Sequence, residues 1–159
     1  MKKLRKNKGM GLVEIIIGAA IITTGILAII VSYTTYVEYA LSNQKNVESA
    51  FVLEEGLEVM TFLRDDSWTS NIFPLISGTS YYLHWNGTDW SATTTPQYVD
   101  GMLRKIIVGN VFRDGSDKIA ASGTLDPDTK KVTSTVDLWQ GHGTTTSSIS
   151  TYITNLYSN

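Results

Sequence analysis

The hydrophobic pattern of the chain begins with one long apolar stretch. No charged residue occurs between positions 15 and 31, and Glu14 is the only charged residue between positions 10 and 33. A helix spans a bilayer with about 20 apolar residues. The pattern therefore predicts a membrane-spanning helix over residues 10–33, with Tyr33, Tyr36 and Tyr39 at the outer interface that this residue type favours.

The helical pattern continues beyond the apolar stretch as an amphipathic one. Residues 32–64 include no proline and a single glycine, Gly56. Glu48 and Glu55 fall on the side opposite to five apolar residues that recur at steps of three and four. These five residues are expected to pack on the following domain: Val47, Ala50, Leu53, Leu57 and Met60. Both patterns together predict one helix over residues 10–64.

The pattern changes to short alternating runs in residues 65–159. Serine and threonine are abundant here and all four tryptophans follow position 66, a composition typical of strands with polar outer faces around an aromatic core. A hairpin is expected over residues 81–90, around a type I′ turn at Asn86-Gly87. Further strands are expected over 102–113, in the centre of the sheet, over 132–139, and over 147–153.

The predicted fold class follows from the order of these patterns. It is α+β, with a long N-terminal helix, one half transmembrane and one half amphipathic, packed against a C-terminal antiparallel sheet. We divide the chain into a basic leader at 1–9, the helix at 10–64 and a β-rich globular head at 65–159.

The charge distribution indicates how the chain is oriented. The sequence has 13 Lys and Arg against 15 Asp and Glu, a net charge of −2 that argues against a nucleic-acid partner. Its first nine residues hold basic side chains but no acidic ones, so this segment is expected to stay cytoplasmic while the head is exported. The apolar stretch is long for a cleaved secretory signal and no A-x-A site follows it, which favours a retained anchor.

The reactive side chains give no sign of catalysis. The chain has no cysteine, and its two histidines, His84 and His142, accompany no nucleophile motif. Three acidic pairs are better explained as turn formers than as calcium ligands: Asp65-Asp66, Asp114/Asp117 and Asp126/Asp128. We therefore expect no enzyme activity, no catalytic residue, no metal site and no cofactor.

A specific motif surrounds Glu14. A short basic leader ends in Gly9, and Met10-Gly11-Leu12-Val13-Glu14 leads into the isoleucine-rich run. This combination resembles the class III signal of type IV pilins and type II secretion pseudopilins, and residues 53–68 are loosely similar to the helix end of minor pilins. The resemblance implies that a prepilin peptidase cleaves after Gly9 and that the new N-terminal residue, Met10, is N-methylated.

The resemblance also implies a role for Glu14 as the fifth residue of the mature chain. A carboxylate at mid-bilayer costs about 2.5–3.5 kcal/mol. In a filament, Glu14 could pair with the α-ammonium group of Met10 on a neighbouring subunit, which satisfies two groups that are each costly to bury alone. Glu14 would thereby set the register of assembly.

Three glycines of the apolar stretch share one side of the helix. Gly11, Gly18 and Gly25 recur every seven residues. Small residues let transmembrane helices approach closely, so these glycines are expected to form a packing seam between helices.

The resemblance implies a structural subunit, major or minor, of an adhesive, type IV pilus-like extracellular filament. Its partners would be prepilin peptidase, other pilin subunits and an inner-membrane assembly platform. The chain would first be a single-pass protein of the cytoplasmic membrane and then part of a cell-surface filament. The alternatives are a pseudopilin of a type II secretion system and a monomeric, signal-anchored surface domain that binds a ligand.

One further motif lies in the predicted hairpin. Asn86-Gly87-Thr88 matches the acceptor pattern for N-glycosylation. A tight hairpin turn explains the same three residues equally well.

Overall fold

The computed structural model describes residues 10–139 and 143–156. They fall into two units, which meet between Gln44 and Lys45 and are described separately here. Two sequence predictions lie outside the described residues: the cleavage residue Gly9 and the turn that includes His142.

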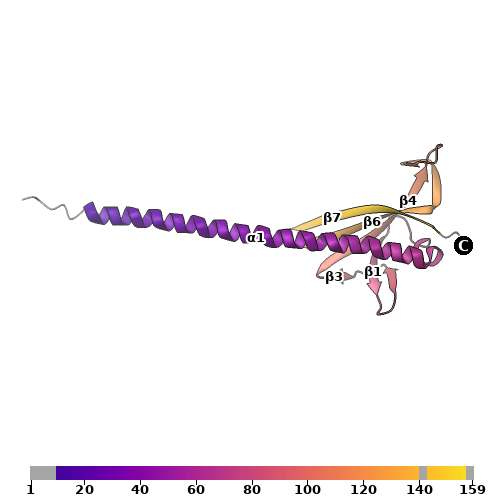
Figure 1. The fold of residues 1–159 in the computed structure, drawn as a ribbon, viewed down its shortest axis with the longest axis horizontal. Coiled ribbons are helices and arrows are strands. Elements are labelled where there is room, and N and C mark those ends of the chain that lie inside the picture. Colours follow the sequence, from indigo (N-terminus) through magenta and orange to yellow (C-terminus); the bar gives the residue numbers. More distant parts are fainter. Residues whose placement is uncertain (1–9, 140–142, 157–159) are drawn as a thin grey trace, which may run out of the picture. The chain divides into compact units, whose positions relative to one another are not determined.

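One helix, α1, runs from Met10 to Asp66 and confirms the predicted helix to within two residues at its end (Figure 1). Up to Gln44 it forms the first unit by itself. No proline interrupts it, and the alanine and leucine residues of its N-terminal half favour the helical backbone.

The second unit joins the end of α1 to a seven-stranded antiparallel sheet. A short π-helical turn, η1 (Trp68–Ile72), follows the helix and is capped by Ser67, whose hydroxyl accepts a hydrogen bond from the Ser70 N–H. The strands are β1 (Ser80–Trp85), β2 (Trp90–Thr93), β3 (Tyr98–Val99), β4 (Met102–Arg113), β5 (Ile119–Ala120), β6 (Thr124–Trp139) and β7 (Thr144–Thr154).

The sheet has the order β2-β1-β4-β6-β7, and the short strands β3 and β5 also pair with β4. The predicted central position of 102–113 is therefore confirmed, and β4 has the expected bounds. The fold is α+β, as predicted, with β4, β6 and β7 lying along the C-terminal part of α1 (Figure 1).

The core lies between α1 and the inner face of the sheet. Alternate residues of β6 are buried, because successive side chains of a strand point to opposite faces. One cluster of buried side chains includes Met60, Ile72, Ile106, Val108, Val132 and Ile153, and a second includes Val52, Leu53, Met102, Val136 and Leu138.

The buried side of α1 differs from the predicted stripe by roughly one residue, or about 100° around the helix. Leu53 and Met60 are buried as expected, but Val47 is 56% exposed and Ala50 is exposed. The side that faces the sheet instead includes Ser49, Val52, Gly56, Val59 and Leu63. Small residues on this side allow the helix to approach the sheet closely, which apolar periodicity alone does not reveal.

The strand β6 begins earlier than predicted, because the Asp126-Pro127-Asp128 segment lies inside the strand and not in a turn. Its pairing with β4 shifts register between Asn110 and Val111, so Pro127 falls at an irregularity where no ladder hydrogen bond is required of it. Within this bulge the Asp126 carboxylate accepts a hydrogen bond from the Asp128 N–H at 3.0 Å. These residues form the local side chain-to-backbone hydrogen bond that is typical of turns, but here it stabilises a β-bulge within the strand.

The predicted hairpin is present as β1 and β2, with its turn displaced by one residue. The Asn86 N–H donates to the Asp89 carbonyl at 3.2 Å, so Gly87 and Thr88 take the central positions. Gly87 adopts a φ of +103°, which favours glycine at this position. Asn86 itself has no positive φ, contrary to the type I′ expectation.

Candidate functional site

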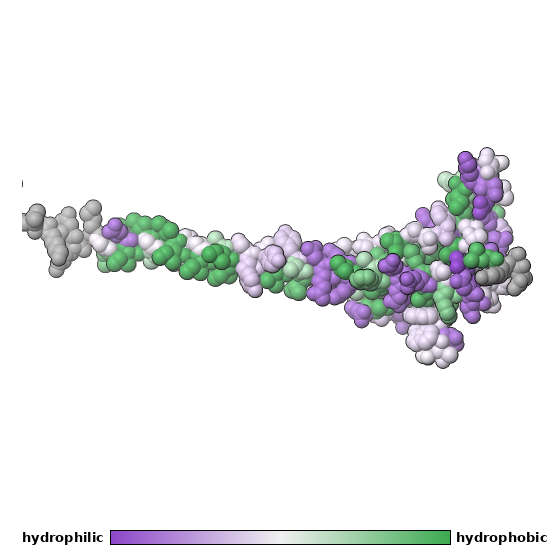
Figure 2. Space-filling model, in the orientation of Figure 1, coloured by the Kyte–Doolittle hydropathy of each residue, from purple (hydrophilic) through white to green (hydrophobic). Residues whose placement is uncertain are grey.

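The N-terminal unit presents a long apolar surface. Every described side chain of residues 11–17 and 19–36 is exposed within the chain itself, among them Ile15 at 74% and Ile29 at 70%. This helix is long and apolar enough to cross a membrane, and none of its most apolar window is buried (Figure 2). Such a surface is stable only in lipid or against other apolar surfaces.

The threonine hydroxyl groups on this surface are satisfied by the helix itself. Thr23 donates to the Ala19 carbonyl at 2.8 Å, and Thr24 donates to the Ala20 carbonyl at 3.0 Å. Thr34 and Thr35 both donate to the Val31 carbonyl at 2.9 Å. These polar residues therefore enter an apolar environment without leaving a hydroxyl proton unpaired.

Glu14 interrupts this surface with a single carboxylate. Its backbone lies in the second turn of α1, four residues after Met10. Among the residues that the structure describes, Glu14 takes part in no ion pair. A carboxylate costs free energy in an apolar environment unless an opposite charge or hydrogen bonds compensate it.

The predicted seam glycines share one property. A Cβ atom added at Gly11, Gly18 or Gly25 would find no atom of this chain within 4 Å. Packing within the chain therefore does not require glycine at these positions, and the packing seam between helices stays a prediction.

The junction of α1 with the sheet centres on a buried arginine that the sequence patterns missed. Arg104 is only 2% exposed, and its Nη1 lies 3.2 Å from Glu55 Oε1 and 3.4 Å from the Val52 carbonyl oxygen. The signal was present in β4, where Arg104 occupies an inward position of the alternation between Met102 and Ile106. Glu55, predicted on the far side of the helix, turns toward the sheet to meet this charge.

Two exposed phenylalanines lie on the opposite side of this part of α1. Phe51 is 66% exposed and Phe62 is 54% exposed, and both share this side with Val47. Exposed Glu54 and Glu58 lie between the two phenylalanines on this side, so each phenylalanine is a separate exposed apolar side chain.

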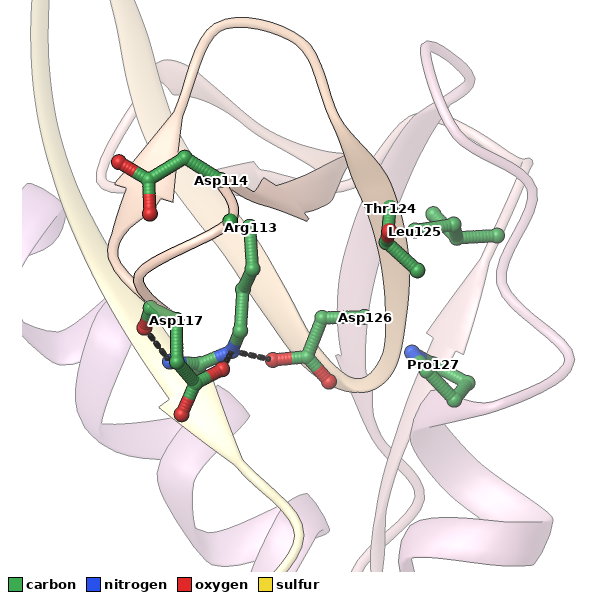
Figure 3. A pocket seen from close by; sticks show the side chains of 8 residues that line it. Arg113, Asp114, Asp117, Thr124, Leu125, Asp126 and Pro127 are labelled. Atoms are coloured by element: carbon green, nitrogen blue, oxygen red, sulfur yellow. Dashed lines mark hydrogen bonds and ion pairs between the residues drawn. The ribbon is translucent and has the colours of Figure 1, made fainter.

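The outer end of β4 and β6 forms an open cleft of about 440 Å³ around Arg113 (Figure 3). Arg113 Nε lies 2.7 Å from Asp126 Oδ2, and its Nη1 donates to the Asp117 carbonyl at 2.9 Å. The hydrogen bond to Asp126, opposed by burial, raises the pKa of Arg113. Burial raises the pKa of Asp126, but hydrogen bonds from Arg113, Thr129 and the Asp128 backbone outweigh it and hold the pKa below its ordinary value.

The hydrogen bonds around this cleft order the loop of residues 114–118. The Asp114 carboxylate accepts hydrogen bonds from the Ser116 N–H at 2.8 Å and the Lys118 N–H at 3.0 Å, which folds the loop back toward β5. Arg113 places a positive charge between Asp117 and Asp126, where a cation would have to sit. These hydrogen bonds and ion pairs hold the β4–β6 connection together.

An acidic group on the outer sheet face makes stability depend on pH. A hydrogen bond from Lys105, whose Nζ lies 2.6 Å from Asp137 Oδ2, lowers the pKa of Asp137, and the Thr146 hydroxyl adds to this against the effect of burial. A folded-state pKa below the unfolded value of about 3.9 stabilises the fold above that pH. This contribution is lost as the pH falls through the lowered value.

We therefore expect Asp137→Asn to flatten the loss of stability as the pH falls below about 4. Urea unfolding of the full chain in detergent, at neutral and acidic pH, measures the effect. Asp89→Asn, in the exposed hairpin loop, is the matched control. Identical acid dependence in the two variants would contradict the assignment to the Lys105–Asp137 pair.

Comparisons with protein-family models, with curated protein sequences and with solved structures find no match to this chain. Its function is therefore argued from its own residues.

Proposed function

We propose that this chain is a structural subunit, major or minor, of a type IV pilus-like extracellular filament. Prepilin peptidase cuts it after Gly9, Met10 is N-methylated, and the apolar helix with Glu14 joins it to other subunits. The observation that carries the proposal is the exposed apolar surface of α1, interrupted by the Glu14 carboxylate, which forms no ion pair with any residue that the structure describes.

The two parts of α1 fit a helix whose N-terminal part moves from lipid into a filament while its C-terminal part stays packed on the sheet. As an anchor, residues 10–33 lie in lipid, which matches their apolar surface and internally bonded threonines. In a filament the same surface is buried against neighbouring helices, so extraction from the membrane exchanges one apolar environment for another. The part of α1 after Lys45 stays under the sheet in both states, because its inner side is already buried.

Glu14 sets the axial alignment of neighbouring subunits in the proposed filament. Cleavage after Gly9 creates an α-ammonium group on Met10, four residues from the carboxylate. A neighbouring chain whose Met10 reaches Glu14 pairs the two charges, and this fixes the axial stagger between subunits. The exposed Phe51 and Phe62 add two apolar side chains outside the membrane region for contacts between neighbouring heads.

Mass spectrometry of the N-terminus of the protein from its own cells tests this proposal. The expected peptide begins at N-methylated Met10 in the wild type, and Gly9→Val is expected to abolish this processing because the leader loses its terminal glycine. Asn7→Val, which adds apolar bulk two residues earlier, is the matched control and should be processed. A wild-type chain that still begins at Met1 would overturn the proposal and indicate a signal-anchored surface domain.

A further inference from the structure

The tip of the β1–β2 hairpin is an exposed acceptor for modification. Residues 84–89 are all exposed, and they contain the Asn86-Gly87-Thr88 motif. No other asparagine of the sequence is followed two positions later by serine or threonine. The motif thus occurs once, at a point of the described head where an approaching enzyme meets no obstruction.

The hydrogen bonds of Asn86 distinguish the two ends of its carboxamide. Its Oδ1 accepts the Thr88 N–H and the Asp89 N–H, each at 2.8 Å. Among the described residues its Nδ2 group has no hydrogen-bond partner, and neither does the Thr88 hydroxyl. The turn therefore uses only the carboxamide oxygen and leaves the nitrogen free.

The residue before Asn86 is an unexpectedly exposed tryptophan. Trp85 is 47% exposed although the sequence predicted tryptophans in the core, where Trp68 does lie at 7% exposure. The Trp85 ring is supported by Trp90, with centroids 5.5 Å apart and planes tilted by 49°. A supported and partly exposed aromatic ring offers an apolar surface on which the C–H face of a pyranose can pack.

We propose that Asn86 carries an N-linked glycan whose first sugar packs on Trp85. The inference rests on the proposed function only in requiring that the head is exported. An oligosaccharyltransferase on that side of the membrane would use a lipid-pyrophosphate-linked oligosaccharide as donor. The Asn86 Nδ2–C1 bond forms, the bond from C1 to the pyrophosphate oxygen breaks, Nδ2 loses one proton, and the lipid pyrophosphate leaves.

Peptide mass spectrometry of the full chain from its own cells tests the site. The peptide that contains Asn86 is expected to carry a glycan mass, and both Asn86→Gln and Thr88→Ala are expected to remove it. Thr88→Ser retains the hydroxyl and is the matched control that should keep the glycan. Thr88→Ala leaves the backbone hydrogen bonds of the turn in place, so a loss there reports on the acceptor motif and not on folding.

The two proposals fail in different ways in the same sample. An unmodified Asn86 peptide overturns the glycan, whether or not the N-terminus is processed at Met10. A glycosylated Asn86 in a chain that still begins at Met1 overturns the filament subunit and keeps the modification. Packing on Trp85 is checked by enzymatic removal of the glycan, which should lower the Tm of the wild type and leave that of Trp85→Ala unchanged.

Discussion

Glu14→Ala is expected to leave cleavage after Gly9 intact and to exclude the chain from filaments. Without the carboxylate, each incorporated subunit would bury an unpaired α-ammonium group, a penalty of several kcal/mol. Because each 1.4 kcal/mol is a factor of ten in an equilibrium constant, incorporation should fall by much more than tenfold. Immunoblots of sheared filaments and of membranes from the same cells measure incorporation and processing separately.

Two further variants make this result specific to charge and place. Glu14→Gln keeps the size of the side chain and removes its charge, so it should fail as Glu14→Ala does. Glu38→Ala removes the next exposed acid along the same helix and should be incorporated normally. Glu14→Ala chains at wild-type level in sheared filaments would refute the pairing of Glu14 with Met10.

Gly56→Ala is expected to destabilise the head by about 1–3 kcal/mol, although alanine is the better helix former. The added Cβ would lie 2.6 Å from Ser134 Oγ, 3.0 Å from Arg104 Cδ and 3.2 Å from Ile106 Cδ1. These atoms are packed in the core between α1 and the sheet, so the helix must move away from β4 and β6. Chemical unfolding of the full chain in detergent, followed by tryptophan fluorescence, measures the change.

Ser134 provides the control for this prediction. Its hydroxyl is buried without a hydrogen-bond partner among the described residues, so Ser134→Ala should be neutral or stabilising. The double variant Gly56→Ala/Ser134→Ala removes the closest of the three contacts and should recover part of the loss. Strictly additive effects in the two single variants and the double variant would show that the 2.6 Å approach does not determine the cost.

The main elements of the fold follow from the periodicity of the sequence. The unbroken apolar and amphipathic pattern predicts α1, and the run around Ile106 predicts β4 as the central strand. The alternation from Val132 to Leu138 predicts which residues of β6 are buried. In each case the hydrophobic period, 3.6 residues for a helix or two for a strand, matches the residues that pack in the core.

The details that escaped prediction depend on close contact between distant residues. Gly56 and Ser49 form part of the buried side of α1 because of their small size. Arg104 is buried because it forms an ion pair with Glu55 and donates a hydrogen bond to the Val52 carbonyl. Pro127 lies within β6 because the β4 register shifts beside it. Hydrophobicity patterns along the chain do not show which distant residues will contact each other.

The sequence predicts which residues form the candidate assembly site, but it does not reveal their surroundings. The motif around Glu14 names the residues, whereas the exposure of the surrounding isoleucines and the internal bonding of the threonines come from the structure. The role of Glu14 and the cleavage after Gly9 stay predictions, because they concern contacts with other chains and an enzyme.

The burial of Ile153 has a consequence for when the head can fold. Ile153, at 2% exposure, belongs to the same cluster as Met60, although the two lie on the order of 90 residues apart in the chain. On the proposed export route, the C-terminal part of α1 crosses the membrane before β7, so its inner side has no packing partner until β7 follows. Such long-range closure is slow. That route therefore implies an interval in which the uncovered inner side of α1 is open to aggregation, proteolysis and capture by chaperones.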